Sequence, residues 1–219
     1  MAKAASIQDR LLAMEERGIW DAVMSWLQTH QLAIGSVLAL FLLLVGGSFY
    51  WRYQRAVALE SLRRGVATLQ SGDTQKALDE LQKIQSVSVG NTEKALGLFY
   101  LGEAYATLGK KDDAIKSYER ALAVMKGGEA GSYFEQLVTL KTAQAIESSG
   151  TEGSAAQAQK KYEQAAALDG PLQIEALAAA ARLAEKLNDS VTAKTLYEKL
   201  SSMSAAHPLA EVFQGKVGR

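Results

Sequence analysis

The chain has 219 residues, of which 48% are hydrophobic and 22% charged, and its 24 Lys and Arg balance 24 Asp and Glu. A net charge of zero gives no field that would attract nucleic acid, so we expect no nucleic-acid partner. The sequence has no cysteine, which excludes disulfide scaffolds, thiolate metal sites and cysteine nucleophiles. Few aromatic residues (7%), two prolines and many helix-forming residues favour an all-α fold.

The N-terminal segment, residues 1–31, has the pattern of a short amphipathic helix near its end. Its apolar residues recur at i, i+3, i+4 and i+7 and would share one helix face: Trp20, Val23, Met24 and Leu27. Such a helix can lie among the lipid headgroups, extend a membrane helix into water, or dock onto a partner protein. The sequence leaves these three options open.

The next segment, residues 32–51, reads LAIGSVLALFLLLVGGSFYW and contains no charged side chain. As a helix it would span about 30 Å, the thickness of the hydrocarbon core of a bilayer. A cleavable signal peptide would need a basic segment near residue 1 and a shorter apolar run, and a buried core helix rarely runs this long without a charge. We therefore predict a retained transmembrane helix, anchored by Leu32, Phe41, Tyr50, Trp51 and Arg52.

The clearest internal pattern covers residues 98–122, LFYLGEAYATLGKKDDAIKSYERAL. Its spacing matches a tetratricopeptide repeat, which is a pair of antiparallel helices. Small residues let the two helices approach closely, while larger residues fill the seam between them and the next pair. The expected packing residues are Leu98, Leu101, Gly102, Tyr105, Ala114, Tyr118 and Ala121.

Similar spacings recur on both sides and predict a solenoid of about four helix pairs within residues 52–204. The first pair is marked by Gly65, Ala77, Leu81 and Ile84, the third by Ala158, Tyr162 and Ala165, and the fourth by Ala193, Tyr197 and Leu200. In the third pair, the first helix (about 133–146) lacks a clear motif, and the turn after it is about three residues too long. Its register therefore stays open. Residues 205–219 have the pattern of a polar cap or a frayed tail.

This layout of a short N-terminal segment, one membrane helix and a helical-repeat domain resembles a known family. Together with Gly102, Tyr105, Ala114 and Tyr118, it is similar to the ancillary SecYEG translocon subunits of Gram-negative bacteria, the YfgM-like proteins. The resemblance implies a single-pass protein of the bacterial inner membrane with its repeats in the periplasm. There it would sit beside the translocon and pass emerging polypeptides to chaperones.

The basic residues around the predicted span indicate the opposite orientation. Arg17 is alone on the N-terminal side, whereas four arginines follow the span closely: Arg52, Arg55, Arg63 and Arg64. The positive-inside rule, applied by itself, therefore puts the repeats in the cytoplasm. Large domains cross membranes largely regardless of charge, so we follow the family and expect periplasmic repeats.

The expected interaction surface is the concave groove that the first helices of stacked repeats line. In the first two pairs this face is mostly apolar, which suits an extended or helical peptide with hydrophobic anchors. The alternative is that the chain itself fills the groove, or that these residues pack against the preceding helix. The predicted groove residues are Leu59, Leu62, Val66, Leu69, Leu96, Phe99 and Glu103.

The sequence offers no pattern of a catalytic, cofactor or metal site. Its acidic pairs are adjacent, so their side chains point to different sides of a helix, and neither His30 nor His207 has an evident partner. We expect no enzyme activity, no cofactor, no metal and no small-molecule substrate; the expected partners are other proteins and the lipid bilayer. Two function classes remain: a module that receives or relays exported polypeptides, and a structural subunit or assembly scaffold of another membrane complex.

Overall fold

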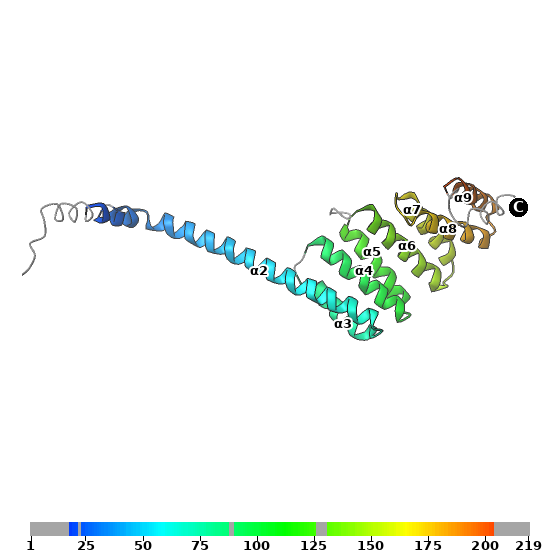
Figure 1. The fold of residues 1–219 in the computed structure, drawn as a ribbon, viewed down its shortest axis with the longest axis horizontal. Helices are drawn as coiled ribbons and strands as arrows, with labels where there is room; N and C mark the ends of the chain where they lie inside the picture. The colour runs from blue at the N-terminus through cyan, green and yellow to red at the C-terminus, as the bar shows by residue number, and fades with distance from the viewer. Residues whose placement is uncertain (1–17, 22, 88–89, 126–130, 204–219) are drawn as a thin grey trace, which may run out of the picture. The chain divides into compact units, whose positions relative to one another are not determined.

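The computed structural model describes residues 18–21, 23–87, 90–125 and 131–203. All regular secondary structure in these ranges is helical (Figure 1). The predicted C-terminal cap or tail, residues 205–219, lies outside the described residues. The chain divides into two compact units, Met1–Arg52 and Tyr53–Arg219.

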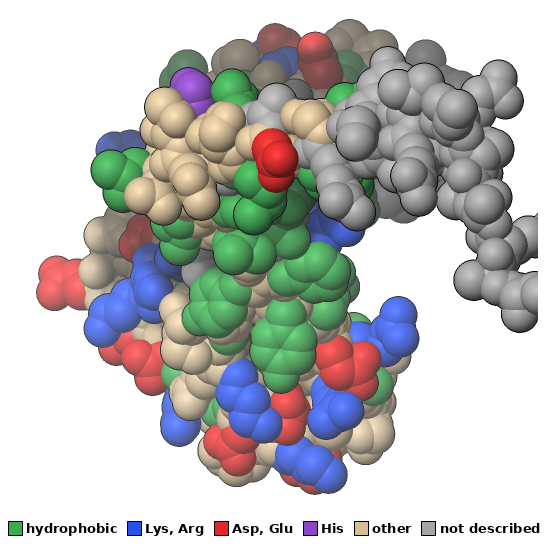
Figure 2. All heavy atoms as spheres, turned by 90° about the vertical axis from the view of Figure 1, so that its left-hand side faces the viewer, with side chains coloured by type: hydrophobic (Ala, Val, Ile, Leu, Met, Phe, Trp, Pro, Cys, Tyr) green, Lys and Arg blue, Asp and Glu red, His purple; other side chains and the backbone are tan. Residues whose placement is uncertain are grey.

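The first unit contains a short helical stretch and most of the apolar part of α2. Residues 18–21 and 23–29 are helical, His30 forms a turn, and α2 runs over Gln31–Gln70. By length and composition α2 could cross a membrane, and its apolar window is not buried anywhere. Figure 2, a view from the left-hand side of Figure 1, shows hydrophobic side chains gathered near the centre of that face. The anchor residues Leu32, Phe41, Tyr50, Trp51 and Arg52 are all exposed.

The second unit is a stack of helix pairs. The C-terminal part of α2 pairs with α3 (Thr74–Lys83), which continues into a short 3-10 helix, Ile84–Ser86. The other three pairs are α4 with α5, α6 with α7, and α8 with α9. Their bounds are Asn91–Thr107, Lys111–Met125, Ser132–Ser149, Ser154–Ala167, Gln173–Lys186 and Ser190–Met203. The predicted all-α stack of four pairs is confirmed.

Each pair turns at a residue in the left-handed conformation. These residues are Gly72, Gly109, Gly150 and Asn188, with φ of 87°, 72°, 67° and 60°. A residue with positive φ lets the N–H of the following residue donate a hydrogen bond to the carbonyl five positions earlier. A carbonyl at the end of the helix thereby gains a partner. Lys110 N donates in this way to Tyr105 O at 2.9 Å, and Asp189 N donates to Ala184 O at 2.9 Å.

The third pair settles the register that the sequence left open. Helix α6 extends past Ile146 to Ser149, so the turn that follows occupies residues 150–153. This turn holds two left-handed glycines, Gly150 and Gly153, whereas the turn after α4 holds Gly109 alone. The extra residues therefore form a longer turn between α6 and α7, and the helices themselves still pair.

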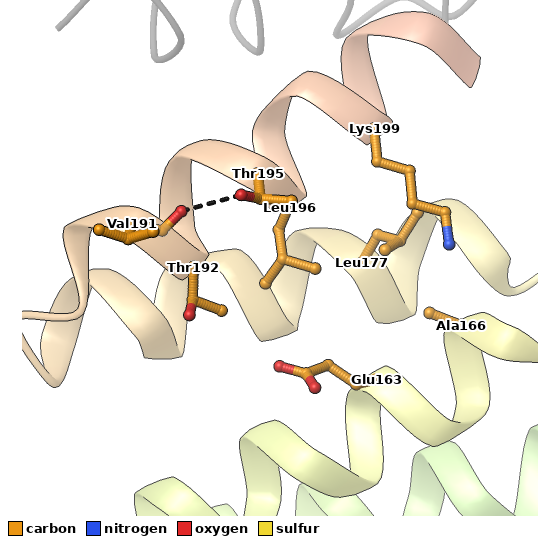
Figure 3. Close-up of a pocket in the computed structure, with 8 residues that line it drawn as sticks. All are labelled: Glu163, Ala166, Leu177, Val191, Thr192, Thr195, Leu196 and Lys199. Carbon is orange, nitrogen blue, oxygen red and sulfur yellow. Dashed lines mark hydrogen bonds between the residues drawn. The ribbon is translucent and has the colours of Figure 1, made fainter.

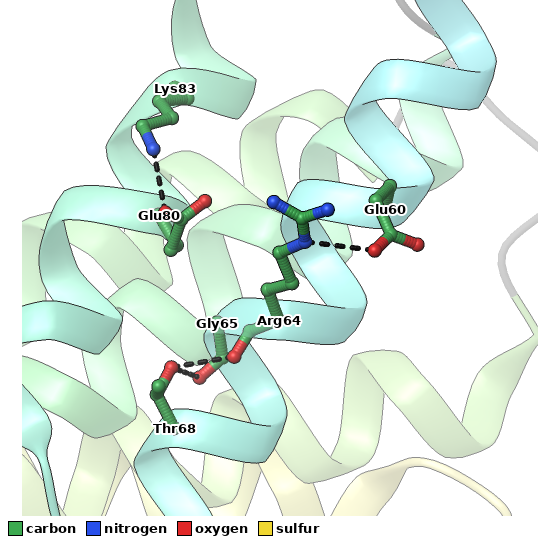
Figure 4. A network of polar contacts seen from close by, with 6 residues as sticks. All are labelled: Glu60, Arg64, Gly65, Thr68, Glu80 and Lys83. Carbon is green, nitrogen blue, oxygen red and sulfur yellow. Dashed lines mark hydrogen bonds and ion pairs between the residues drawn. The ribbon is translucent and has the colours of Figure 1, made fainter.

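The pairs pack because small residues face large ones across each seam. A Cβ on Gly102 would lie 2.5 Å from the ring of Tyr118, and a Cβ on Gly65 would lie 2.6 Å from Leu81. Figure 4 shows the α2–α3 contact from close by, where the i,i+4 pair Arg64–Glu60 and the i,i+3 pair Lys83–Glu80 lie on the surface. The buried side chains thus form a chain of clusters along the stack.

Candidate protein-interaction surface

The residues expected to fill the seams lie at the contacts between helices. Tyr105 is half-buried, and the others are buried: Leu98, Leu101, Gly102, Ala114, Tyr118, Ala121, Tyr162 and Tyr197. Tyr118, Tyr162 and Tyr197 come from α5, α7 and α9, the second helices of three successive pairs. Each of these tyrosines extends its hydroxyl to a glutamate of its paired first helix.

The expected groove residues of the first pair differ in their exposure. Leu59 is 45% exposed, whereas Leu62, Val66 and Leu69 are half-buried. Leu62 and Leu69 pack against the cluster formed by α2, α3 and α4. In the second pair, Leu96 is half-buried. Leu59 is therefore exposed apolar surface, and Val66 and Leu96 are partly accessible, on the first helices of neighbouring pairs.

Phe99 does not have the expected position. It is only 7% exposed and lies among three aromatic rings, those of Tyr100, Tyr118 and Phe134, at centroid distances of 5.2, 5.9 and 5.5 Å. These rings come from α4, α5 and α6. Because aromatic rings gain both buried area and edge-to-face contact, Phe99 joins two pairs instead of facing an open groove.

Glu103, the last expected groove residue, links two neighbouring pairs. Its Oε1 accepts a hydrogen bond from the Tyr118 hydroxyl at 2.5 Å. Its Oε2 pairs with Nζ of Lys141, in α6, at 3.2 Å. Burial and the neighbouring carboxylate raise the pKa of Tyr118 far above its ordinary range, so the hydroxyl stays protonated and donates.

Glu147 repeats this arrangement one pair later. Its Oε2 accepts from the Tyr162 hydroxyl at 3.0 Å, and both of its oxygens accept from Arg182 of α8, at 2.8 and 2.9 Å. The hydrogen bonds from Arg182 hold the pKa of the Glu147 carboxyl below its ordinary value, because they favour the charged form. Burial raises the pKa of Tyr162 in turn.

A third ion pair completes a series along the first helices. Arg55 of α2 approaches Glu93 at the start of α4 to 2.5 Å, and the Glu93 side chain is 8% exposed. We call the three pairs Arg55–Glu93, Lys141–Glu103 and Arg182–Glu147 the first-helix ladder. Their members are 38, 38 and 35 residues apart, close to one repeat period. Opposite charges that recur at this spacing are the sequence signal for the ladder, which was not predicted above.

The ladder changes how the groove face can act. Polar and ionic contacts occupy the first helices of the later pairs, where Gln144 Nε2 also lies 3.4 Å from Glu175 Oε1. Their carboxylates are already neutralised by cations of this chain, so they offer little net charge to a ligand. Among the expected groove residues, Leu59 is exposed, and the half-buried Val66 and Leu96 keep part of their apolar surface accessible.

A buried polar residue that was not predicted from the sequence fixes the third pair. Gln136 of α6 is fully buried, and its Nε2 donates to the carbonyls of Ala165 and Leu168 at 3.2 and 2.9 Å. Its Oε1 accepts from Leu172 N at 3.1 Å. The side chain thus satisfies the backbone between α7 and α8, where an apolar residue could not. No local pattern marks it, because its partners lie 29 to 36 residues away.

The last two pairs also carry a cleft of about 330 Å³ between α7, α8 and α9. Figure 3 shows Glu163, Thr192 and Leu196 pointing toward one another across it. The cleft is lined chiefly by α7 and α9, the second helices of their pairs, with Leu177 of α8 at its base. It is therefore separate from the first-helix surface.

Comparison with known proteins agrees with this geometry. Residues 95–127 match the family model of the tetratricopeptide repeat. The chain carries tetratricopeptide-like repeats. A crystal structure from Podosopora anserina contains nearly identical copies of a TPR-like repeat of kinesin light chain type. It superposes on this chain with a TM-score of 0.57 at 16% sequence identity, over 72% of this chain and 82% of that chain. A variant of the same protein gives a TM-score of 0.56 at 17% identity with equal coverage.

Identities this low show a shared fold alone, and no curated protein matches the sequence. Stacked repeats of this kind present extended surfaces that generally bind other proteins. Tetratricopeptide repeats are typically scaffold-like. The repeats therefore indicate a protein–protein interaction module.

Proposed function

We propose that this protein is a membrane-anchored interaction module that receives or relays exported polypeptides beside the Sec translocon. The observation that carries the proposal is the presence, in one chain, of a fully exposed apolar helix segment and a stack of tetratricopeptide-like repeats. The first needs a lipid environment, and the second offers a surface for proteins.

Exposure is what favours a membrane anchor over a soluble core helix. Leu38, Phe41, Leu42 and Leu43 are 56%, 60%, 67% and 73% exposed. A continuous apolar surface of this kind is costly in water and is stable when lipid covers it. Tyr50, Trp51 and Arg52 at its C-terminal end are the residue types that anchor a helix at the membrane interface.

The apolar residues Leu59 and Leu96 favour clients that carry hydrophobic side chains. Polypeptides in transit are unfolded and expose such side chains, which shallow apolar surfaces can bind without reading a specific charge pattern. The translocon as neighbour rests on the resemblance to the YfgM-like layout. The alternative, a structural subunit of another membrane complex, would use the same surface for one fixed partner.

Site-directed photo-cross-linking in cells separates these two functions. Benzoylphenylalanine placed at Leu59 and at Leu96 should form adducts with many exported polypeptides and with translocon subunits. The matched control is Glu119, an exposed residue of α5 on the second-helix side, where we expect few adducts. Adducts with a single stoichiometric partner at Leu59 and Leu96 would reject the relay function in favour of the scaffold.

The orientation of the repeats needs its own experiment. The chain has no cysteine, so a Glu152→Cys variant carries one thiol, in the exposed turn between α6 and α7. Periplasmic repeats predict rapid labelling by a membrane-impermeant maleimide in cells with a permeabilised outer membrane. Labelling only after the inner membrane is broken would place the repeats in the cytoplasm, as the arginine count indicates.

A further inference from the structure

The helical stretch before α2 has one apolar arc and one polar arc. The apolar arc is exposed throughout: Ile19, Trp20, Val23, Met24, Trp26 and Leu27 are between 37% and 65% exposed. The opposite side carries Asp21, Ser25, Gln28 and Thr29. An exposed apolar arc with two tryptophans needs a covering surface, and the described residues of this chain do not provide one.

His30 and Trp26 contact each other where this stretch meets α2. His30 Nδ1 lies 2.9 Å from the carbonyl oxygen of Trp26, and since a carbonyl only accepts, the imidazole donates this bond. The two rings also stack, with centroids 4.9 Å apart and planes at 25°. The same carbonyl oxygen accepts a second hydrogen bond from the backbone N–H of His30 at 3.0 Å, and His30 forms a turn between residues 23–29 and Gln31. The turn at His30 separates the amphipathic stretch from α2.

We infer that the helical residues 18–21 and 23–29 lie at the membrane interface, with their apolar arc inserted into the headgroup region of the bilayer. This inference rests on the proposed membrane anchor. Because the apolar segment of α2 begins at Leu32, the short helix ends within three residues of the membrane surface. Tryptophan is enriched at that depth, where its ring contacts acyl chains and its N–H meets water or headgroups.

The charge of the segment specifies the type of lipid surface. Residues 18–31 contain one carboxylate, Asp21, and no Lys or Arg. Arg17 directly precedes this segment and balances Asp21, so residues 17–31 have no net positive charge, and attraction to anionic lipids adds little. Binding therefore comes from apolar area alone, and the helix inserts as well into zwitterionic phosphatidylcholine as into membranes with anionic phosphatidylglycerol.

Tryptophan fluorescence of the full-length protein in vesicles tests this inference. One variant, Trp26→Phe with Trp51→Phe, leaves Trp20 on the apolar arc. A second, Trp20→Phe with Trp26→Phe, leaves Trp51 at the end of the anchor. With lipids brominated at known depths, Trp20 should be quenched most by bromine near the headgroups. Its quenching should be equal with and without phosphatidylglycerol and at low and high salt.

The two reporters distinguish failure of this inference from failure of the anchor. Quenching of Trp51 without quenching of Trp20 would overturn the interfacial helix and leave the anchor intact; the short helix would then lie in water or await a protein partner. Absence of both signals would overturn the anchor as well. Quenching of Trp20 that requires anionic lipid or is lost at high salt would contradict insertion by apolar area.

Paired substitutions check that the arc itself inserts. Met24→Asp puts a charge on the apolar arc and should reduce Trp20 quenching by about half or more. Ser25→Asp, one residue away on the polar arc, should leave the quenching unchanged. Equal effects of the two substitutions would show that the exposed arc does not face lipid.

Discussion

Glu147 and Arg182 form a two-pronged ion pair between α6 and α8, with nitrogen–oxygen distances of 2.8 and 2.9 Å. The arrangement matches the planar guanidinium to the planar carboxylate, which makes the contact directional. Tyr162 donates to the same carboxylate from α7. Three helices of two neighbouring pairs therefore meet at one side chain, which fixes how the third pair stacks on the fourth.

Replacing Glu147 by Gln should weaken this stacking without changing its shape. The pair is partly exposed to solvent, so we expect the free energy of unfolding to fall by about 1 kcal/mol at neutral pH. Arg182 lowers the pKa of Glu147 from 4.5, so the stabilisation is complete above that pH and is lost as the pH falls through the lowered pKa of the folded state. Urea unfolding followed by circular dichroism at neutral and acidic pH measures both effects. Glu119→Gln, at an exposed position, is the control. If Glu147→Gln still unfolds with a lower free energy than the wild type in strong acid, the ion pair with Arg182 is not the source of the stabilisation.

The contact between Gly102 and Tyr118 predicts that even a methyl group is too large. A Cβ at position 102 would lie 2.5 to 3.0 Å from three carbons of the Tyr118 ring, which is 1% exposed and has no room to move. Gly102→Ala should therefore destabilise the repeats by about 1–3 kcal/mol. Gly131→Ala is the control, because nothing lies within 4 Å of its Cβ and its φ is −59°. Equal midpoints in thermal unfolding for the two variants would show that α4 and α5 do not approach this closely.

The buried tyrosines predict a loss of stability in alkaline solution. Burial raises the pKa of Tyr118 from its ordinary value of 10.0, and the pKa values of Tyr162 and Tyr197 are raised too. The contribution of these tyrosines to the free energy of unfolding is complete below about pH 10. It is lost above that pH, because the tyrosines then ionise in the unfolded chain but stay protonated in the folded one. The free energy of unfolding of Tyr118→Phe should fall less steeply above pH 10 than that of the wild type. Tyr133 is 52% exposed, so Tyr133→Phe should keep the wild-type dependence of the free energy of unfolding on pH. The same pH dependence in Tyr118→Phe would show that Tyr118 does not cause the alkaline loss of stability.

The hydrogen bonds of Gln136 predict a strong effect at a site without a repeat motif. Gln136→Leu keeps the volume of the side chain and leaves the Leu168 carbonyl and the Leu172 amide without this partner. We expect a loss of about 2–4 kcal/mol, the cost of buried polar groups that lose their hydrogen bonds. Gln157→Leu, in an exposed position of α7, should change the free energy of unfolding by less than about 0.5 kcal/mol. A neutral Gln136→Leu would mean that water or relaxed backbone replaces these bonds.

The repeat pattern was predictable because its determinants are close in sequence. Gly102 and Tyr118 belong to one helix pair, and the left-handed Gly109 lies in the turn between them. A small residue, a turn and a large residue at a fixed spacing specify two helices packed together, whatever surrounds them. The same spacing, with Tyr162 and Tyr197 as the large residues, predicted the second helices of the third and fourth pairs.

The placement of Phe99 was not predictable from that spacing. Its position in the repeat is one that can face the groove, and its burial depends on Phe134, which belongs to the next pair. The register of the third pair was open for a similar reason. Gln136 is satisfied only by backbone groups of α7 and of the connection to α8, so its role exists only once the chain is folded.

The amino-acid sequence alone determined the uninterrupted apolar segment at residues 32–51 and the helical stack that follows, because both depend on composition and on spacings shorter than one repeat. The tertiary structure decided which side chains remain available to a partner. Contacts between neighbouring pairs bury Phe99 and occupy Glu103 and Glu147, and they leave Leu59 exposed and Leu96 half-buried. These contacts join residues a full repeat apart, and only the packing of one pair on the next brings them together.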